Sequence, residues 1–376
     1  MQGDSARSPG CCHAVRRILV LVAILLCLGV LQNYSITVSL SAARGQLVAV
    51  TPSVVKQAII VGVGIFAYWF CSRFKYMRWA DISGFLTYAL GALLIAVLIP
   101  AIGRSVNGSS RWIGTGSIGL QPSQGAILVV PLLAAKLFSG KYLNQYDRRF
   151  YRTFLLFALG FTVLVALEPD FGTAFVIAGS SIAILLGVGA PFGYWISQTA
   201  ALGVVALIAV NVKDSWKVRM TSFINPLSAD KAKDVAYQLV NSMFAVARGG
   251  VTGRGFMRSV QKFVHFPAQE NDFVFAIFSE EFGLVGVTIV LGIFLWIVFD
   301  LFKIASRSSE PFARVYVMGL GVFLAVQAFV NIGVVVGLLP TTGVPLPFFS
   351  QGGNHIVFEM AALGIAGAIS RSPEAV

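Results

Sequence analysis

The stretch Asp272-Phe-Val-Phe-Ala-Ile-Phe-Ser-Glu-Glu-Phe-Gly283 opens an apolar run that continues to about residue 302. A run of this length is enough to cross a bilayer as a helix. Asp272 then lies at the predicted boundary between membrane and water, whereas Glu280 and Glu281 lie inside the run. Ionisable groups are costly inside a membrane and are functional candidates by default. Asp272 could equally be an N-cap, because Asp is favoured where a helix starts.

The composition extends this reading to the whole chain of 376 residues. Hydrophobic residues make up 57% and charged residues 12%, a balance that excludes a soluble domain and predicts an all-α, polytopic membrane protein. The net charge is +12, but the basic residues lie between apolar runs, which argues against nucleic acid as a partner. Cys11, Cys12, Cys27 and Cys71 lack metal-ligand spacing, so we expect no metal site built by cysteine.

Ten candidate membrane spans follow from the length of the apolar runs. They lie at about 18–38, 52–72, 80–102, 119–138, 153–168, 171–189, 192–212, 273–302, 315–337 and 353–370. Residues 1–376 are then a single integral membrane domain with short cytoplasmic tails. A large outer loop at about 213–272 separates spans seven and eight.

The positions of lysine and arginine favour this topology, because cytoplasmic loops carry an excess of both. With the N-terminus inside, the short outer loops hold only Arg44, Lys56, Arg104 and Arg111. The inner segments hold Arg7, Arg16, Arg17, Arg73, Lys75, Arg78, Lys136, Lys141, Arg148, Arg149, Arg152, Lys303, Arg307, Arg314 and Arg371. We therefore expect both termini in the cytoplasm.

The large outer loop is also basic, although loops of this length are largely exempt from the rule. Arg254, Arg258 and Lys262 are four residues apart and would share one helical face. Such a face could meet an anionic substrate or lipid headgroups. The Asp234–Ala247 segment predicts an amphipathic helix on the membrane surface. The glycines that follow it predict flexible backbone or close approach to a ligand.

Two other outer loops are rich in glycine and proline, at Ser109–Ser123 and Leu338–Gly353. Irregular backbone at membrane depth is tolerated only where it is buried in protein or lines a wet cavity. Each loop could be an ordinary turn. Because both lie on the same predicted face as Asp272, we expect a shared outward cleft.

These loops together resemble the SEDS family, the polytopic glycosyltransferases of bacterial cell elongation, division and sporulation. The motifs that carry the resemblance are Arg111-Trp-Ile, Leu120-Gln-Pro-Ser123, Glu168-Pro-Asp-Phe-Gly-Thr173, Gly253-Arg-Gly255, Asp272-Phe-Val-Phe-Ala, Glu280-Glu-Phe-Gly283, Asn331-Ile-Gly, Gly337-Leu-Leu-Pro-Thr-Thr-Gly-Val-Pro-Leu-Pro347 and Ser350-Gln-Gly-Gly353. They span nearly the whole chain beyond the second span.

The chain departs from the family pattern at several positions. The family usually has Glu and Lys where this chain has Gln124 and Ile127, and His where it has Glu270. The family's Ser-Tyr-Gly-Gly-Ser-Ser is Ser350-Gln-Gly-Gly-Asn-His355 here. Details of substrate and ion contacts therefore differ, while Asp272 stays in place.

The resemblance implies polymerisation of lipid II, the undecaprenyl-diphosphate-linked disaccharide of peptidoglycan, on the outer face of the bacterial cytoplasmic membrane. Asp272 would be the general base, because the attacking hydroxyl must lose a proton. Arg111, Arg254 and Lys262 would hold the leaving diphosphate, with Glu280 and Ser350 as further substrate contacts. A divalent cation such as Mg²⁺ could serve the same purpose as the basic residues.

The implied partners are a class B penicillin-binding transpeptidase and other division or elongation machinery. The Pro-Thr-Thr-Gly and Pro-Phe-Phe-Ser motifs of the last loop favour a role in division. Two alternatives stay open. A lipid II flippase would also need broken spans and intramembrane acids, and a scaffold without turnover could position the transpeptidase.

Overall fold

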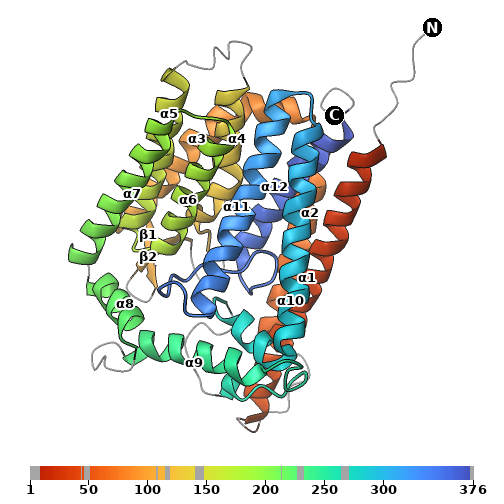
Figure 1. The fold of residues 1–376 in the computed structure, drawn as a ribbon, viewed down its shortest axis with the longest axis vertical. Helices are drawn as coiled ribbons and strands as arrows, with labels where there is room; N and C mark the ends of the chain where they lie inside the picture. Colours follow the sequence, from red (N-terminus) through yellow and green to blue (C-terminus); the bar gives the residue numbers. More distant parts are fainter. Residues whose placement is uncertain are drawn as a thin grey trace.

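The computed structural model describes residues 9–43, 45, 51–106, 109–114, 119–139, 148–212, 214–226, 233–263 and 271–372. Long apolar helices dominate this part of the chain and run side by side (Figure 1). The helices that match the predicted spans in order are α1 (Pro9–Ala43), α2 (Pro52–Arg73), α3 (Tyr76–Leu98), α4 (Ala126–Phe138), α5 (Arg148–Leu167), α6 (Phe171–Gly187), α7 (Phe192–Val212), α10 (Val274–Arg307), α11 (Pro311–Val335) and α12 (Gly353–Arg371). The all-α polytopic fold is confirmed.

Six of the described helices are long and apolar enough to cross a membrane: α1, α2, α3, α5, α10 and α11. Three shorter apolar helices cover Pro122–Phe138, Phe171–Gly187 and Phe192–Ile208. The count of ten crossings therefore stays a prediction. The start of α1 and the end of α12 lie at one end of the bundle, opposite to α8 (Asp214–Ile224) and α9 (Lys233–Gly249) (Figure 1). An even number of crossings would place them so.

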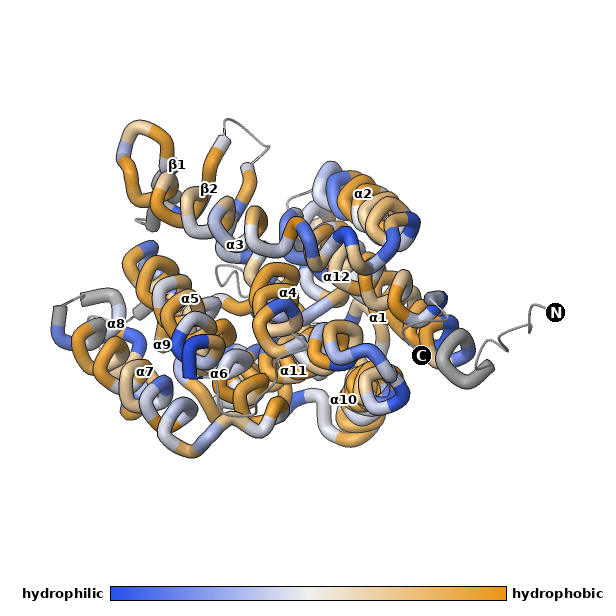
Figure 2. Tube along the Cα trace, turned by 90° about the horizontal axis from the view of Figure 1, so that it is seen from above, coloured by the Kyte–Doolittle hydropathy of each residue, from blue (hydrophilic) through white to orange (hydrophobic). Residues whose placement is uncertain are grey.

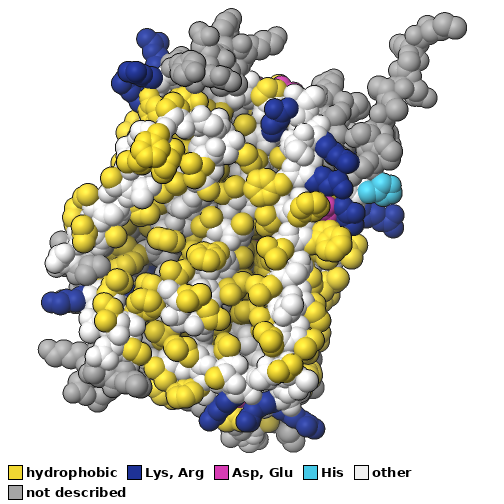
Figure 3. Space-filling view, in the orientation of Figure 1, with side chains coloured by type: hydrophobic (Ala, Val, Ile, Leu, Met, Phe, Trp, Pro, Cys, Tyr) yellow, Lys and Arg dark blue, Asp and Glu magenta, His cyan; other side chains and the backbone are white. Residues whose placement is uncertain are grey.

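Helix α11 forms the buried centre of the bundle. It packs against α4, α6 and α10. In its most apolar stretch 72% of the residues are buried, against 17% for α2. Seen end-on, α4 and α11 are surrounded by the other helices (Figure 2). Apolar side chains cover the middle of the molecule, and most Lys and Arg gather near its two ends (Figure 3). This distribution matches a bilayer around the middle of the bundle.

Short elements close the end that lies away from the termini. Helix α9 confirms that the amphipathic segment is helical. Helix α8 and an antiparallel hairpin of β1 (Gly103–Val106) and β2 (Ser109–Ile113) were not predicted from the sequence. Two 3-10 turns, η1 (Pro122–Gly125) and η2 (Gln261–Phe263), complete the described elements.

Candidate functional site

A cleft opens where the hairpin, α8, the start of α10 and the loop before α12 meet. Its volume is about 1020 Å³, open mouth included. The lining residues are Arg111, Trp112, Gln121, Gln124, Arg219, Asn271, Asp272, Gly343, Pro345, Gln351, Gly352, Gly353, Asn354 and His355. All three outer loops with unusual sequences therefore contribute, as expected from their glycine and proline content.

Asp272 lies at the wall of this cleft, immediately before α10. The N-cap of that helix is Phe273, and no side-chain capping bond is made there. The alternative in which Asp272 is an N-cap is therefore wrong. The amide of Asn331 in α11 donates to the backbone carbonyl of Asp272 at 2.9 Å and to that of Val344 at 2.7 Å. One core side chain thus ties the start of α10 to the last loop and leaves the Asp272 carboxylate for the cleft.

The electrostatic surroundings set the proton affinity of Asp272. The pKa of its carboxyl is raised to about 6, mainly by burial and in the same direction by the nearby Asp170. Arg219 and Arg111 act in the opposite direction, because a cation stabilises the carboxylate. The group is then mostly ionised at neutral pH while still able to take up a proton, as a general base requires.

Arg111 reaches the cleft from β2 and is held by the turn between α5 and α6. Its Nε donates to the carbonyl of Glu168 at 3.4 Å, and its Nη2 donates to the carbonyl of Pro169. Its Nη1 lies 3.9 Å from a carboxylate oxygen of Asp170. The guanidinium thus satisfies carbonyls at the end of α5, and its side chain remains 20% exposed toward the cleft.

Asp170 joins that turn to the first outer loop. It is the N-cap of α6 and accepts from the Thr173 N–H at 3.3 Å. It also accepts from the Gln121 side chain at 3.0 Å. The two motifs, Leu120-Gln-Pro-Ser123 and Glu168-Pro-Asp-Phe-Gly-Thr173, are therefore parts of one polar network at the cleft wall.

Arg219 is the cleft residue that sequence reasoning missed. It projects from α8, and its Nη1 donates to the carbonyl of Thr341 in the last loop at 2.6 Å. Burial lowers the pKa of its guanidinium, but arginine stays charged in proteins. In the sequence it is one of many basic residues in the outer loop, and no spacing distinguishes it.

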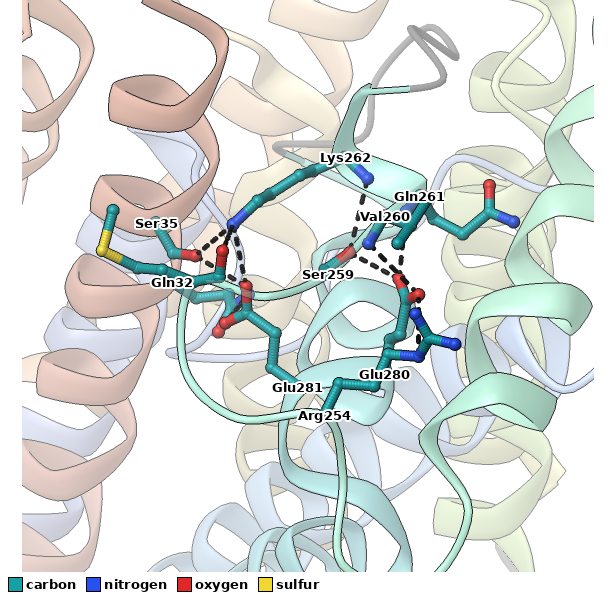
Figure 4. Close-up of polar contacts among 10 residues, drawn as sticks. Gln32, Ser35, Arg254, Ser259, Val260, Gln261, Lys262, Glu280 and Glu281 are labelled. Carbon is teal, nitrogen blue, oxygen red and sulfur yellow. Dashed lines mark hydrogen bonds and ion pairs between the residues drawn. The ribbon is translucent and has the colours of Figure 1, made fainter. Parts of the chain in front are cut away.

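Glu280 and Glu281 do not line the cleft. Their carboxylates point toward Ser259 and Lys262 respectively (Figure 4). Glu281 pairs with Lys262 at 3.2 Å and accepts from Ser35 of α1 at 2.7 Å. Glu280 accepts from the hydroxyl of Ser259 at 2.5 Å and from two loop N–H groups. The two carboxylates therefore fasten the loop before η2 to α10, one of them also to α1. We name Lys262, Glu281, Ser35, Glu280 and Ser259 the loop anchor.

The loop before η2 packs against a break in α10. Gly283 has a φ of +62° and interrupts the helix. The carbonyls of Glu280 and Glu281 accept from the N–H groups of Arg254 at 3.0 Å and Gly255 at 2.9 Å. A Cβ on Gly253 would overlap the carbonyl of Glu281. Gly253 is thus required for the close approach of this loop to α10.

The structure places three predicted substrate contacts, Arg254, Lys262 and Ser350, outside the lining of the cleft. The shared helical face of Arg254, Arg258 and Lys262 is wrong, because residues 250–260 form turns and bends. Lys262 is fully buried, and Arg254 lies 4.0 Å from Glu280 with 44% of its side chain exposed. The buried Ser350 accepts from the N–H of Leu346 at 2.8 Å and so stabilises its own loop. The loop before η2 folds back onto α10, and there Lys262 pairs with the buried Glu281.

Three of the departures from the family pattern gather in one place. A second, narrow pocket with room for about one water-sized molecule is lined by Gln124, Ile127 and His355, together with Glu359 and Gln327. His355 also lines the cleft. Gln124, Ile127 and His355, where this chain departs from the family pattern, thus line one pocket beside the cleft. Glu270 lies outside the described residues.

Among the described residues that line the cleft, Asp272 has the one carboxylate that could bind a divalent cation. Nor do the described residues contain a cluster of three or more His, Cys, Asp or Glu. Mg²⁺ is often held by one or two carboxylates plus substrate phosphates, so Asp272 with a bound diphosphate could hold it. The two cleft arginines already supply positive charge, and we assign no step to an ion.

Comparisons with known proteins agree with this geometry. Residues 16–374 match the family described as cell cycle protein, FtsW/RodA/SpoVE. Stage V sporulation protein E of Bacillus subtilis is 32% identical over 319 residues, 84% of this chain and 86% of the relative. The probable peptidoglycan glycosyltransferase FtsW of Thioalkalivibrio sulfidiphilus is 35% identical over 318 residues, covering 82% and 78%.

Solved structures show the same fold. A chain from the study "Structural coordination of polymerization and crosslinking by a peptidoglycan synthase complex" aligns with a TM-score of 0.74 at 25% identity, covering 94% of this chain and 96% of that one. The rod shape determining protein RodA of Thermus thermophilus aligns with a TM-score of 0.68 at 25% identity, covering 94% and 95%. The fold and cleft define a polytopic membrane protein with an active-site-like pocket at one end. The chain belongs to the SEDS family.

Proposed function

We propose that this chain is a peptidoglycan glycosyltransferase that polymerises lipid II, with Asp272 as the general base. The observation that carries the proposal is the convergence of Asp272, Arg111 and Arg219 on one open cleft from three separate segments. The class of reaction is supported by relatives named probable peptidoglycan glycosyltransferase.

The chemistry assigns a role to each of these groups. A sugar hydroxyl of one substrate attacks the anomeric carbon of the other, and the bond from that carbon to the diphosphate breaks. Asp272 takes the hydroxyl proton, for which a carboxylate of pKa about 6 is suited. Arg111 and Arg219 stabilise the charge that develops on the leaving diphosphate, and their contacts to backbone carbonyls orient them beforehand.

The assignment of substrate contacts changes accordingly. Arg111 is retained from the sequence prediction, and Arg219 joins it. Lys262, Glu280 and Ser350 act in the framework that holds the loops, and Arg254 lies at its exposed edge.

For the cellular role we propose division rather than elongation, in the bacterial cytoplasmic membrane with both termini in the cytoplasm. Relatives named FtsW support this preference. The partner would be a class B penicillin-binding transpeptidase. The similar fold in a peptidoglycan synthase complex that coordinates polymerization and crosslinking supports such a partner.

The test is a glycan assay. The purified chain and its transpeptidase are given labelled lipid II, and the products are resolved on a gel. We expect polymer from the native chain, none from Asp272→Asn, and native amounts from Asp81→Asn, whose exposed side chain lies in α3. Lipid II movement between leaflets without polymer would favour the flippase. Polymer that depends on the transpeptidase alone would favour the scaffold.

A further inference from the structure

A groove between α1 and α10 lies at the end of the bundle that carries both termini, far from the proposed active site. Its volume is about 860 Å³, open space included, and it is lined by His13, Arg16, Arg17, Val20, Leu21 and Trp296. Basic side chains and a histidine gather at this edge of the molecule (Figure 3).

The α1 wall of the groove is a single helical stripe. Residues 13, 16, 17, 20 and 21 recur at the spacing that places side chains on one face. The stripe changes from polar to apolar along the helix, over a rise of about 12 Å. The wall therefore presents cations at its start and hydrocarbon at its end, as a membrane helix does where it passes from headgroups to acyl chains.

The stripe offers a ligand one unpaired cation and one guanidinium held in place. Arg17 makes a two-point contact with the buried Asp300 of α10, at 2.6 and 3.1 Å, which fixes its guanidinium at the groove while 45% of the side chain stays exposed. Arg16 is exposed, and within the described residues neither Arg16 nor His13 has a hydrogen bond or ion pair. Asp300 offsets the charge of Arg17, and Arg16 is left as a net cation.

Trp296 forms the opposite wall from α10 and is 55% exposed. Tryptophan prefers the level of the headgroups, where its ring meets hydrocarbon and its N–H meets polar groups. Cations, an indole N–H and an apolar floor in one groove match the phosphate and acyl chains of a lipid. Basic pockets between helices at the cytoplasmic side recognise anionic headgroups in this way.

We propose that the groove lined by His13, Arg16, Arg17 and Trp296 is a binding site for an anionic glycerophospholipid. The phosphate lies between Arg16 and Arg17, and one acyl chain lies along Val20 and Leu21. The site is separate from the proposed active site, because none of its residues lines the cleft.

Trp296 makes the site measurable. The full chain is reconstituted in nanodiscs of unlabelled phosphatidylcholine that contain phosphatidylglycerol or phosphatidylcholine with brominated acyl chains. The chain has six tryptophans, so the fluorescence lost by Trp296 is the difference between the native chain and Trp296→Phe. We expect brominated phosphatidylglycerol to quench this component at a several-fold lower mole fraction than brominated phosphatidylcholine.

Matched variants test the assignment. Arg16→Gln should reduce the preference on the order of fivefold, the effect of one basic residue at a membrane surface. Arg307→Gln removes an exposed cation outside the groove and should leave it unchanged. Equal quenching by the two lipids, an intact preference in Arg16→Gln, or no Trp296 quenching by either lipid would overturn the proposal. Loss of the preference on adding millimolar inorganic phosphate would assign the groove to a free anion instead.

Discussion

Lys262 and Glu281 form an ion pair in which both side chains are fully buried, with Nζ 3.2 Å from Oε1. The pair joins the loop before Asp272 to the broken start of α10, and the hydroxyl of Ser35 brings α1 to the same carboxylate. Because a buried charge is tolerated only when it is paired, this contact fixes how the outer loop lies on the bundle.

Removing one partner of this pair should be more harmful than removing both. Lys262→Met leaves the Glu281 carboxylate buried without its cation, a change that costs about 3–5 kcal/mol in other proteins. The double variant Lys262→Met/Glu281→Met should unfold at a higher temperature than Lys262→Met alone. Thermal unfolding of the detergent-solubilised chains measures this, with Arg258→Met as an exposed control. Equal melting temperatures for the single and double variants would contradict the role of the pair.

The activity should depend on pH through Asp272. A base of pKa about 6 is protonated below that pH, so glycan synthesis should fall about tenfold for each unit of acidification well below 6 and level off above it. The rate with subsaturating lipid II, measured from pH 5 to 8, gives this acid limb. A rate that stays flat down to pH 5 would remove Asp272 from proton transfer.

Arg219→Gln should affect both catalysis and that pH profile. The loss of a cation that stabilises the diphosphate should lower the rate on the order of 100-fold. The same cation lowers the pKa of Asp272, so its removal should move the acid limb to higher pH.

Arg258→Gln is the matched control for Arg219→Gln. It removes an equal charge from the same outer loop at an exposed position outside the cleft. An equal loss of activity in both variants would point to general attraction of an anionic substrate. A purely structural role for Arg219 would lower the rate without moving the acid limb.

Topology can be tested by cysteine labelling in intact cells, starting from a chain without native cysteines. A cysteine at Ile224, which is 75% exposed in α8, should react with an impermeant reagent added outside. A cysteine at Ser306, near the end of α10, should react only after the membrane is opened. Labelling of position 224 from the cytoplasm alone would place Asp272 on the inner face, where it could not meet flipped lipid II.

The secondary structure was largely predictable because it depends on local patterns. Apolar length alone placed α2 at 52–72, where the structure has Pro52–Arg73, and α12 at 353–370, where it has Gly353–Arg371. Helix α8 was missed because its mixture of polar and apolar residues carries no span-length signal. The hairpin was missed because its strands are only four and five residues long.

The sequence by itself determined a polytopic helical fold, the cleft-forming loops and the position of Asp272. The length and hydrophobicity of an apolar run and the residues of a motif are local properties of the chain. Only the tertiary structure decided which cations meet that carboxylate. Arg219 and Lys262 are both basic residues of one outer loop, yet α8 places Arg219 at the cleft and η2 places Lys262 against Glu281. The cost of burying each charge is met by different partners, and those partners come from distant segments that no spacing along the chain reveals.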